Sequence, residues 1–124
     1  MPDDPVAVAR AAYDAYVKKD RAAMEVLVAP DYRFTSPLDN AIDRGTYFER
    51  CWPNSAQFAS IDVIQATASG EQVFVVYEGR TNAGKRFRNC EVHTVRNGKL
   101  VATEVYFGWD LPHKAKPGDF ISGA

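Results

Sequence analysis

The sequence is poor in cysteine and has no long apolar run. Its 124 residues include only Cys51 and Cys90, too few for a disulfide framework, so we expect two free, half-buried thiols. No apolar stretch approaches the ~20 residues that a helix needs to cross a bilayer. The first residues are acidic and lack the basic-then-apolar order of a signal peptide. These features predict a cytoplasmic protein that is not associated with a membrane.

An excess of charge of one sign is also lacking. The 15 basic residues are balanced by 16 acidic ones, and the formal net charge is −1. Nucleic-acid binding needs basic residues gathered on one face, so nucleic acid is not an expected partner. Neither of the two histidines, His93 and His113, has metal-ligand spacing to another His or Cys. Without a phosphate loop or a dinucleotide fingerprint, we expect no metal and no other cofactor.

The length and composition are those of one globular domain. The hydrophobic fraction is 46% and the charged fraction 25%, close to ordinary averages. We predict a single domain over residues 1–124, with a core at about 5–110 and an irregular C-terminal tail at 111–124. Phe120 and Ile121 are the candidates to anchor that tail to the body.

Two helices are predicted near the N-terminus. Asp4 is a candidate cap, Pro5 fits the first helical position, and apolar residues then recur at helical spacing as far as Val17. Asp20 predicts the cap of a second, short helix, which Pro30 is expected to end.

A strand, a loop and a third helix are predicted next. Residues 32–36 alternate like a short strand, and residues 38–43 read as a loop. The third helix follows Arg44-Gly45, where Thr46 and Glu49 have the spacing of a capping box. Pro53 is expected to end this helix.

From residue 58 onward the apolar period changes from helical to two. Four strands are predicted at about 58–67, 73–81, 86–96 and 100–107. The Asn97-Gly98 pair before the last one is a strong hairpin signal. Successive hairpins imply an antiparallel meander. Helices followed by strands predict an α+β fold with the helices on one face of the sheet.

Six short segments carry a resemblance to a known superfamily. They are, in order, Lys19-Asp20, Ala29-Pro30-Asp31-Tyr32, Phe34-Thr35-Ser36-Pro37, Asp43-Arg44-Gly45, Asn97-Gly98-Lys99-Leu100 and Tyr106-Phe107. Their order resembles that of the nuclear transport factor 2-like superfamily, most closely its SnoaL-like and ketosteroid-isomerase-like members. The resemblance implies a curved, mainly antiparallel sheet wrapped around N-terminal helices, forming a cone (a cystatin-like α+β barrel). It also implies an internal pocket for a small apolar organic ligand and a homodimer through the outer sheet face.

The resemblance points to positions that carry chemistry in ketosteroid isomerases. Those enzymes use a carboxylate base, a tyrosine and a protonated carboxylic acid. The base position falls on Ser36, whose hydroxyl cannot replace a carboxylate at neutral pH. Asp39, three residues further on, either reaches the site or is a solvated loop residue. The position of the protonated acid falls on Glu91.

Glu91 and His93 share one face of a predicted strand, about 7 Å apart at the backbone. The resemblance directs this face into the pocket. The opposite face carries Cys90, Val92 and Thr94 and is more apolar, so the hydrophobic pattern alone would bury that face instead. Both orientations remain open from the sequence.

Several aromatic residues are candidates to bind a substrate. Tyr13 and Tyr16 both lie near the position of the family tyrosine, and either is also a plausible core residue. We place Tyr13 with Glu91 and His93 in the catalytic set. The substrate-binding candidates, some of which alternatively fill the core, are Tyr16, Ser36, Asp39, Phe48, Trp52, Phe107 and Trp109.

Two functions are consistent with these residues. The first is an enzyme that uses acid–base chemistry on an apolar small molecule, as an isomerase, cyclase, dehydratase or hydrolase. In it Glu91 and His93 act as acid and base, and a tyrosine orients the substrate. The second is a non-catalytic module that binds a hydrophobic small ligand or a partner protein.

Overall fold

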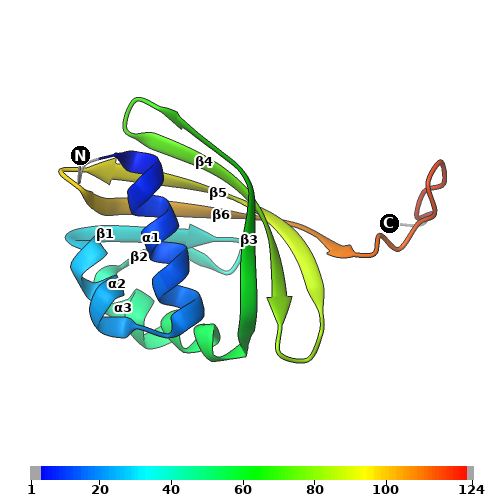
Figure 1. Cartoon of the computed structure of the whole chain (residues 1–124), viewed down its shortest axis with the longest axis horizontal. Helices are drawn as coiled ribbons and strands as arrows, with labels where there is room; N and C mark the ends of the chain where they lie inside the picture. The colour runs from blue at the N-terminus through cyan, green and yellow to red at the C-terminus, as the bar shows by residue number, and fades with distance from the viewer. Residues whose placement is uncertain (1–3, 123–124) are drawn as a thin grey trace.

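The computed structural model describes residues 4–122, and residues 1–3 and 123–124 lie outside the described part (Figure 1). The first residues of the acidic N-terminus and the last two of the predicted tail are therefore not described. The elements are α1 (Pro5–Lys18), α2 (Arg21–Leu27), β1 (Val28–Ser36), β2 (Asp39–Asp43), α3 (Arg44–Arg50), the 3-10 helix η1 (Trp52–Gln57), β3 (Phe58–Ser69), β4 (Gln72–Thr81), β5 (Arg86–Arg96) and β6 (Lys99–Leu111).

The six strands form one curved sheet in the order β2-β1-β6-β5-β4-β3. Strands β3 to β6 are an antiparallel meander, and β1 joins it by a parallel pairing with β6. Figure 1 shows α1 lying across this sheet, with α2 and α3 beside it. The predicted α+β fold and its mainly antiparallel sheet are confirmed. No helix within residues 4–122 is long and apolar enough to span a membrane.

Side-chain caps begin the helices. Asp4 accepts a hydrogen bond from the Val6 N–H at 3.1 Å, and Asp20 accepts one from the Ala23 N–H at 3.1 Å, as the sequence predicts. For α3 the predicted capping box of Thr46 and Glu49 is wrong. The cap is Asp43, which accepts from the backbone N–H of Thr46, so the helix begins at Arg44.

The prolines do not end the helices where predicted. Helix α2 ends at Leu27 and Pro30 lies inside β1; α3 ends at Arg50 and Pro53 lies at the start of η1. The prediction of a loop at 38–43 is also wrong, because most of it is β2. This short edge strand pairs with β1 and is mostly exposed, so it lacks the alternation that marks a half-buried strand.

The core lies between the helices and the concave face of the sheet. Along β4 the residues Val73, Val75 and Tyr77 are buried, whereas Phe74 and Val76 between them are 41% and 37% exposed. This alternation assigns every second residue of the strand to the interior.

The C-terminal segment differs from the prediction. Strand β6 continues to Leu111, so irregular chain begins at residue 112. Phe120 and Ile121 do not anchor it to this chain, because they are 83% and 51% exposed.

Candidate functional site

The concave face of the sheet and the helices enclose an open cavity of about 740 Å³. This volume lies within the range of pockets that bind small organic molecules. Its wall is largely aromatic and aliphatic, with a few polar groups. The polar wall residues in the central strands include Asn89, Glu91, His93 and Thr103, together with the hydroxyl of Tyr77.

Strand β5 turns Glu91 and His93 into this cavity. Their side chains are 12% and 4% exposed, and both line the wall. The alternate residue Cys90 pairs with Val76 and Tyr106 on the neighbouring strands, both of which are substantially exposed. The more apolar set of β5 therefore faces outward, and the hydrophobic pattern alone would have chosen the wrong face.

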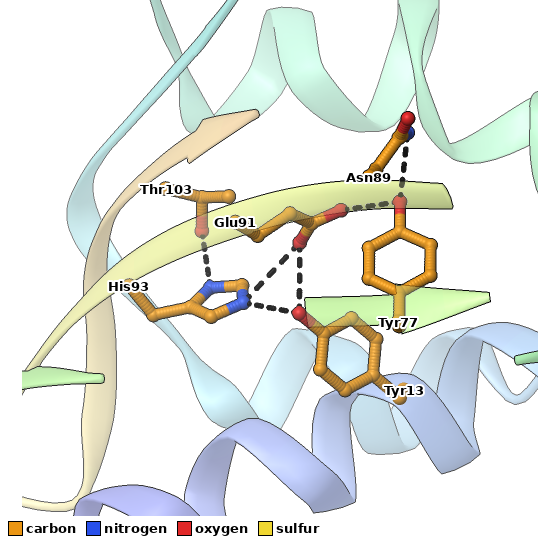
Figure 2. Close-up of polar contacts among 6 residues, drawn as sticks. All are labelled: Tyr13, Tyr77, Asn89, Glu91, His93 and Thr103. Carbon is orange, nitrogen blue, oxygen red and sulfur yellow. Dashed lines mark hydrogen bonds and ion pairs between the residues drawn. The ribbon is translucent and has the colours of Figure 1, made fainter. Parts of the chain in front are cut away.

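The hydroxyl of Tyr13 on α1 joins the two side chains. It lies 3.1 Å from Glu91 Oε1 and 2.8 Å from His93 Nε2, and these last two atoms are 3.2 Å apart. Figure 2 shows the three groups converging from α1 and β5. Of the two tyrosines considered from the sequence, Tyr13, which we placed with Glu91 and His93, is the one that lies in this cluster.

A second tyrosine holds the other carboxylate oxygen. Tyr77 on β4 donates to Glu91 Oε2 at 2.8 Å, and Asn89 Nδ2 donates to the Tyr77 hydroxyl at 3.2 Å. The side-chain amide oxygen of Asn89, Oδ1, in turn accepts a hydrogen bond from the backbone N–H of Gly108 at 3.1 Å. The carboxylate is therefore oriented by a chain of hydrogen bonds that ends on the backbone of β6. Figure 2 shows the part of this chain from Glu91 through Tyr77 to Asn89.

His93 has a partner at each ring nitrogen, because Nδ1 lies 2.9 Å from Thr103 Oγ1. In one proton arrangement Nε2 carries the hydrogen, Thr103 donates to Nδ1, and Tyr13 donates to an ionised Glu91. In another, Nδ1 carries the hydrogen, Tyr13 donates to Nε2, and a protonated Glu91 donates to the tyrosine oxygen. The second arrangement holds one proton more than the first. The cluster can therefore gain or lose a proton without losing these contacts.

The hydroxyls of Tyr13 and Tyr77 remain neutral in both proton arrangements. Burial, followed by the nearby carboxylate of Glu91, raises the pKa of Tyr13 well above its ordinary value. The same two causes, in the same order, raise the pKa of Tyr77. Because ionisation of either phenol is disfavoured, both remain hydrogen-bond donors, Tyr77 to Glu91 and Tyr13 to either Glu91 or His93.

Residues 9–103 match the family model of the SnoaL-like domain. The chain belongs to the SnoaL-like domain family. No curated protein sequence matches this SnoaL-like chain.

Solved structures share the fold of this SnoaL-like protein. An LEH-like epoxide hydrolase from M. tuberculosis has a TM-score of 0.72 at 16% identity, covering 84% of this chain and 82% of its own. A candidate ketosteroid isomerase from Kribbella flavida gives 0.73 at 15%, covering 97% and 89%. IdmH, a candidate polyketide cyclase from Streptomyces antibioticus, gives 0.68 at 20%, covering 82% and 90%. At these identities the likeness shows the fold alone.

Asp39 belongs to a separate polar group on the wall of the SnoaL-like cavity. It forms an ion pair with Arg50, and Ser36 Oγ donates to its Oδ2 at 2.9 Å. Its side chain is only 8% exposed, so it is not a solvated loop residue, and no hydrogen bond joins it to Glu91 within the described residues. Burial alone would raise the pKa of Asp39, but the hydrogen bonds from Arg50 and Ser36 outweigh burial and lower it.

The aromatic candidates divide between the wall and the core. Tyr16 lines the cavity, and so do Phe107 and Trp109, which are 57% and 56% exposed at its rim. Phe48 and Trp52 are buried in the core and do not form part of the described wall. Their predicted contact with a substrate therefore has no support in the geometry.

Sequence reasoning missed Tyr77 and Thr103, and gave Asn89 no role. A regular β4–β5 hairpin places Tyr77 opposite Asn89, so extending the predicted pairing would have found Tyr77. Thr103 was harder to find, because the register of β5 and β6 shifts by one residue between Thr94 and Val95. A hairpin counted straight from the Asn97-Gly98 turn would have placed a different residue opposite His93. Within residues 4–122 no group of three or more His, Cys, Asp and Glu side chains forms a metal site.

Proposed function

We propose that this SnoaL-like protein is a small-molecule enzyme that applies acid–base chemistry to an apolar organic substrate. The observation that carries the proposal is the cluster of Glu91, His93 and Tyr13. Their polar atoms lie within 3.2 Å of one another on the wall of a largely apolar cavity. The enzyme names of the structural neighbours agree with this proposal, although their likeness alone establishes only the fold.

Proton transfer at the carbon atom next to a carbonyl group is the chemistry that this cluster suits. Glu91 accepts a proton from the carbon atom and leaves the electron pair in an enolate. Returning that proton to a second carbon atom completes an isomerisation, and loss of a leaving group completes an elimination. His93 and the tyrosine hydroxyls donate hydrogen bonds to the oxygen on which negative charge develops.

The apolar wall strengthens these interactions. Charges and dipoles interact more strongly where water is excluded, and His93 is almost fully buried. The donors are also fixed before a substrate arrives, because Tyr77 and Thr103 hold Glu91 and His93 in place. Such preorganisation lowers the barrier of a step in which charge moves.

Solvent exchange provides a test that does not require the natural substrate. Enolisable cyclic ketones are incubated with the protein in D₂O, and incorporation of deuterium next to the carbonyl is followed by NMR. The wild-type chain should accelerate exchange of at least one ketone. Glu91→Gln and His93→Ala should each slow it by about 100-fold or more, the usual contribution of a general acid or base.

Glu104→Gln is the matched control for this test. Glu104 lies on β6 next to Thr103, but its side chain is exposed, so the variant should exchange as fast as the wild type. If Glu91→Gln and His93→Ala also retain the full rate, the assignment of the cluster as acid and base is wrong.

The alternative, a binding module without chemistry, has its own supporting observations. Ser36 occupies the position of the family base, and both oxygens of Glu91 already accept hydrogen bonds. A fully paired polar cluster is what any buried carboxylate requires. Tight binding of an apolar fluorescent probe, together with no catalysed exchange of any ketone, would favour this alternative.

We also propose that two copies associate through the outer face of the sheet. Exposed apolar residues gather there on β4 and β6, namely Phe74, Val76 and Tyr106, on either side of Cys90 in β5. Val76→Glu should weaken this association in sedimentation experiments over a dilution series. A wild-type chain that stays monomeric at every concentration would contradict this proposal.

A further inference from the structure

The C-terminal arm, residues 112–122, leaves the body of the molecule. Figure 1 shows it continuing from the end of β6, away from the helices and the rest of the sheet. Its apolar side chains are exposed, with Phe120 83% and Ile121 51% accessible to solvent. An arm that carries apolar groups away from its own core presents them to another molecule.

The arm has a defined shape. The rings of Trp109 and His113 lie 6.1 Å apart, so the start of the arm is held by the end of β6. His113 Nδ1 also accepts a hydrogen bond from the Ala115 N–H at 2.9 Å. Ile121 then returns to line a small cavity of about 280 Å³ with His113 and Trp109. The arm is thus folded into a hook with Phe120 on its outside.

The mouth of the main cavity has an exposed apolar rim. Leu38, Phe107 and Trp109 line the cavity and are 72%, 57% and 56% exposed. Within residues 4–122 these side chains are left more than half exposed. The rim and the arm therefore offer two complementary apolar surfaces, and Trp109 connects them.

We propose that the arm of one copy covers the cavity mouth of a second copy, packing Phe120 and Ile121 against the rim of that copy. Since each arm begins at the rim of its own chain, a two-fold pair brings each arm to the other rim at the same time. This pair is the same one that associates through the outer face of the sheet, so the assembly closes at two copies.

The geometry favours a second copy over the chain's own mouth. To fold back onto its own rim, the arm would have to reverse direction just after Leu111. The rim of a second copy contacts the hook without any change in the conformation of the arm.

The exchange makes the site incomplete in a single chain. Phe120 of the partner subunit would cover part of the open mouth and exclude water from the cluster below it. That consequence rests on the proposed function of the cavity, whereas the association itself does not. The two are therefore tested separately, and the association is measured without any ligand.

Sedimentation of the full chain over a dilution series tests the association. The wild type should form a reversible dimer, and Phe120→Ser combined with Ile121→Ser should raise its dissociation constant by about tenfold or more. The control is Val26→Ser, because Val26 is 67% exposed on α2 and should not change the constant. A monomeric wild type, or a double variant that dimerises like the wild type, would overturn the proposal.

Cross-linking of mixed chains tests the location. One population carries Phe120→Cys and the other Leu38→Cys, both with Cys90→Ser, and a short bis-maleimide is added to the mixture. The expected product joins one chain of each kind. Absence of that product would overturn the proposal. So would a chain carrying both cysteines that links only to itself, since the arm would then cover its own cavity.

Discussion

The hydroxyl of Tyr13 occupies a position that no other group in the cluster can fill. It is within hydrogen-bond distance of both Glu91 and His93, so its removal leaves each of them with one partner fewer. Tyr16, one turn later on the same helix, also lines the cavity. Its ring packs edge-on against Trp52 and Phe58 at 5.6 and 5.2 Å. Tyr13 therefore has a polar role in the cluster, whereas Tyr16 has a packing role.

The first prediction compares their hydroxyls. Tyr13→Phe should lower the free energy of unfolding by about 1–3 kcal/mol, because a buried polar group loses its partner. Tyr16→Phe keeps the ring and should change stability far less. Urea denaturation of both variants measures the difference. Equal losses in the free energy of unfolding of the two variants would show that the hydrogen bonds of the Tyr13 hydroxyl do not stabilise the fold.

The second prediction concerns alkaline pH. Burial is the leading cause that raises the pKa of Tyr13, Tyr16, Tyr32, Tyr47 and Tyr77 above their ordinary value of 10.0. Above that pH the unfolded chain loses these protons while the folded chain keeps them. The stability present below pH 10 should therefore fall by up to about 1.4 kcal/mol per pH unit for each tyrosine.

Denaturation at a series of pH values, with tyrosinate absorbance followed in parallel, measures this effect. Absorbance from the buried phenols should appear together with unfolding. If these tyrosines ionise in a chain that stays folded, the raised pKa values are wrong.

At the scale of single residues, the sequence located the acid and the imidazole but not their surroundings. A period of two placed Glu91 and His93 on one face, and family resemblance chose the correct face against the hydrophobic pattern. The partner Thr103 depends on a register shift between β5 and β6, which no local pattern reveals. Likewise, Tyr13 and Tyr16 are distinguished only by the residues that each of them contacts in the folded chain.

At the scale of elements, the irregular pairing of β5 and β6 connects the site to the cavity rim. The register shifts again beyond Asn89, and Gly108 lies at this second irregularity. Its backbone N–H donates to Asn89, which in turn donates to Tyr77. A Cβ atom at Gly108 would lie 2.1 Å from the Arg88 carbonyl oxygen, so only glycine fits here.

The third prediction tests this close approach. Gly108→Ala should destabilise the chain by about 1–3 kcal/mol, because the strands must separate to admit the methyl group. Gly45→Ala in α3 is the control. The nearest atom to its added Cβ would lie 3.8 Å away, and alanine favours a helix, so stability should not fall. Thermal unfolding compares the two, and a Gly108→Ala chain as stable as the control would contradict the account of this bulge.

The elements themselves were predictable where side chains alternate strongly. Strand β5 matches its predicted bounds of 86–96, because polar and apolar residues alternate along it. Strand β2 was missed, since an edge strand of five residues with little burial shows no such pattern. The ends of α2 and α3 were misplaced because the chain leaves the helix several residues before each proline.

At the scale of the whole molecule, the order of helices and strands sufficed to predict the fold. The cavity follows from that fold, because a curved sheet against N-terminal helices leaves a hollow on its concave side. The direction of the arm did not follow, because Phe120 and Ile121 are largely exposed in the described chain and leave no pattern of burial. Sequence patterns report contacts within a chain better than contacts between copies.

The central claim is that a ligand in this cavity meets the cluster of Glu91, His93 and Tyr13. A crystal structure of the protein with a bound naphthol tests it most directly, because this molecule is apolar and its hydroxyl resembles that of an enol. We predict that the naphthol lies in the main cavity with its oxygen about 2.5–3.2 Å from the side chain of Glu91 or Tyr13. A naphthol bound outside this cavity, or inside it with its oxygen turned away from both side chains, would contradict the account.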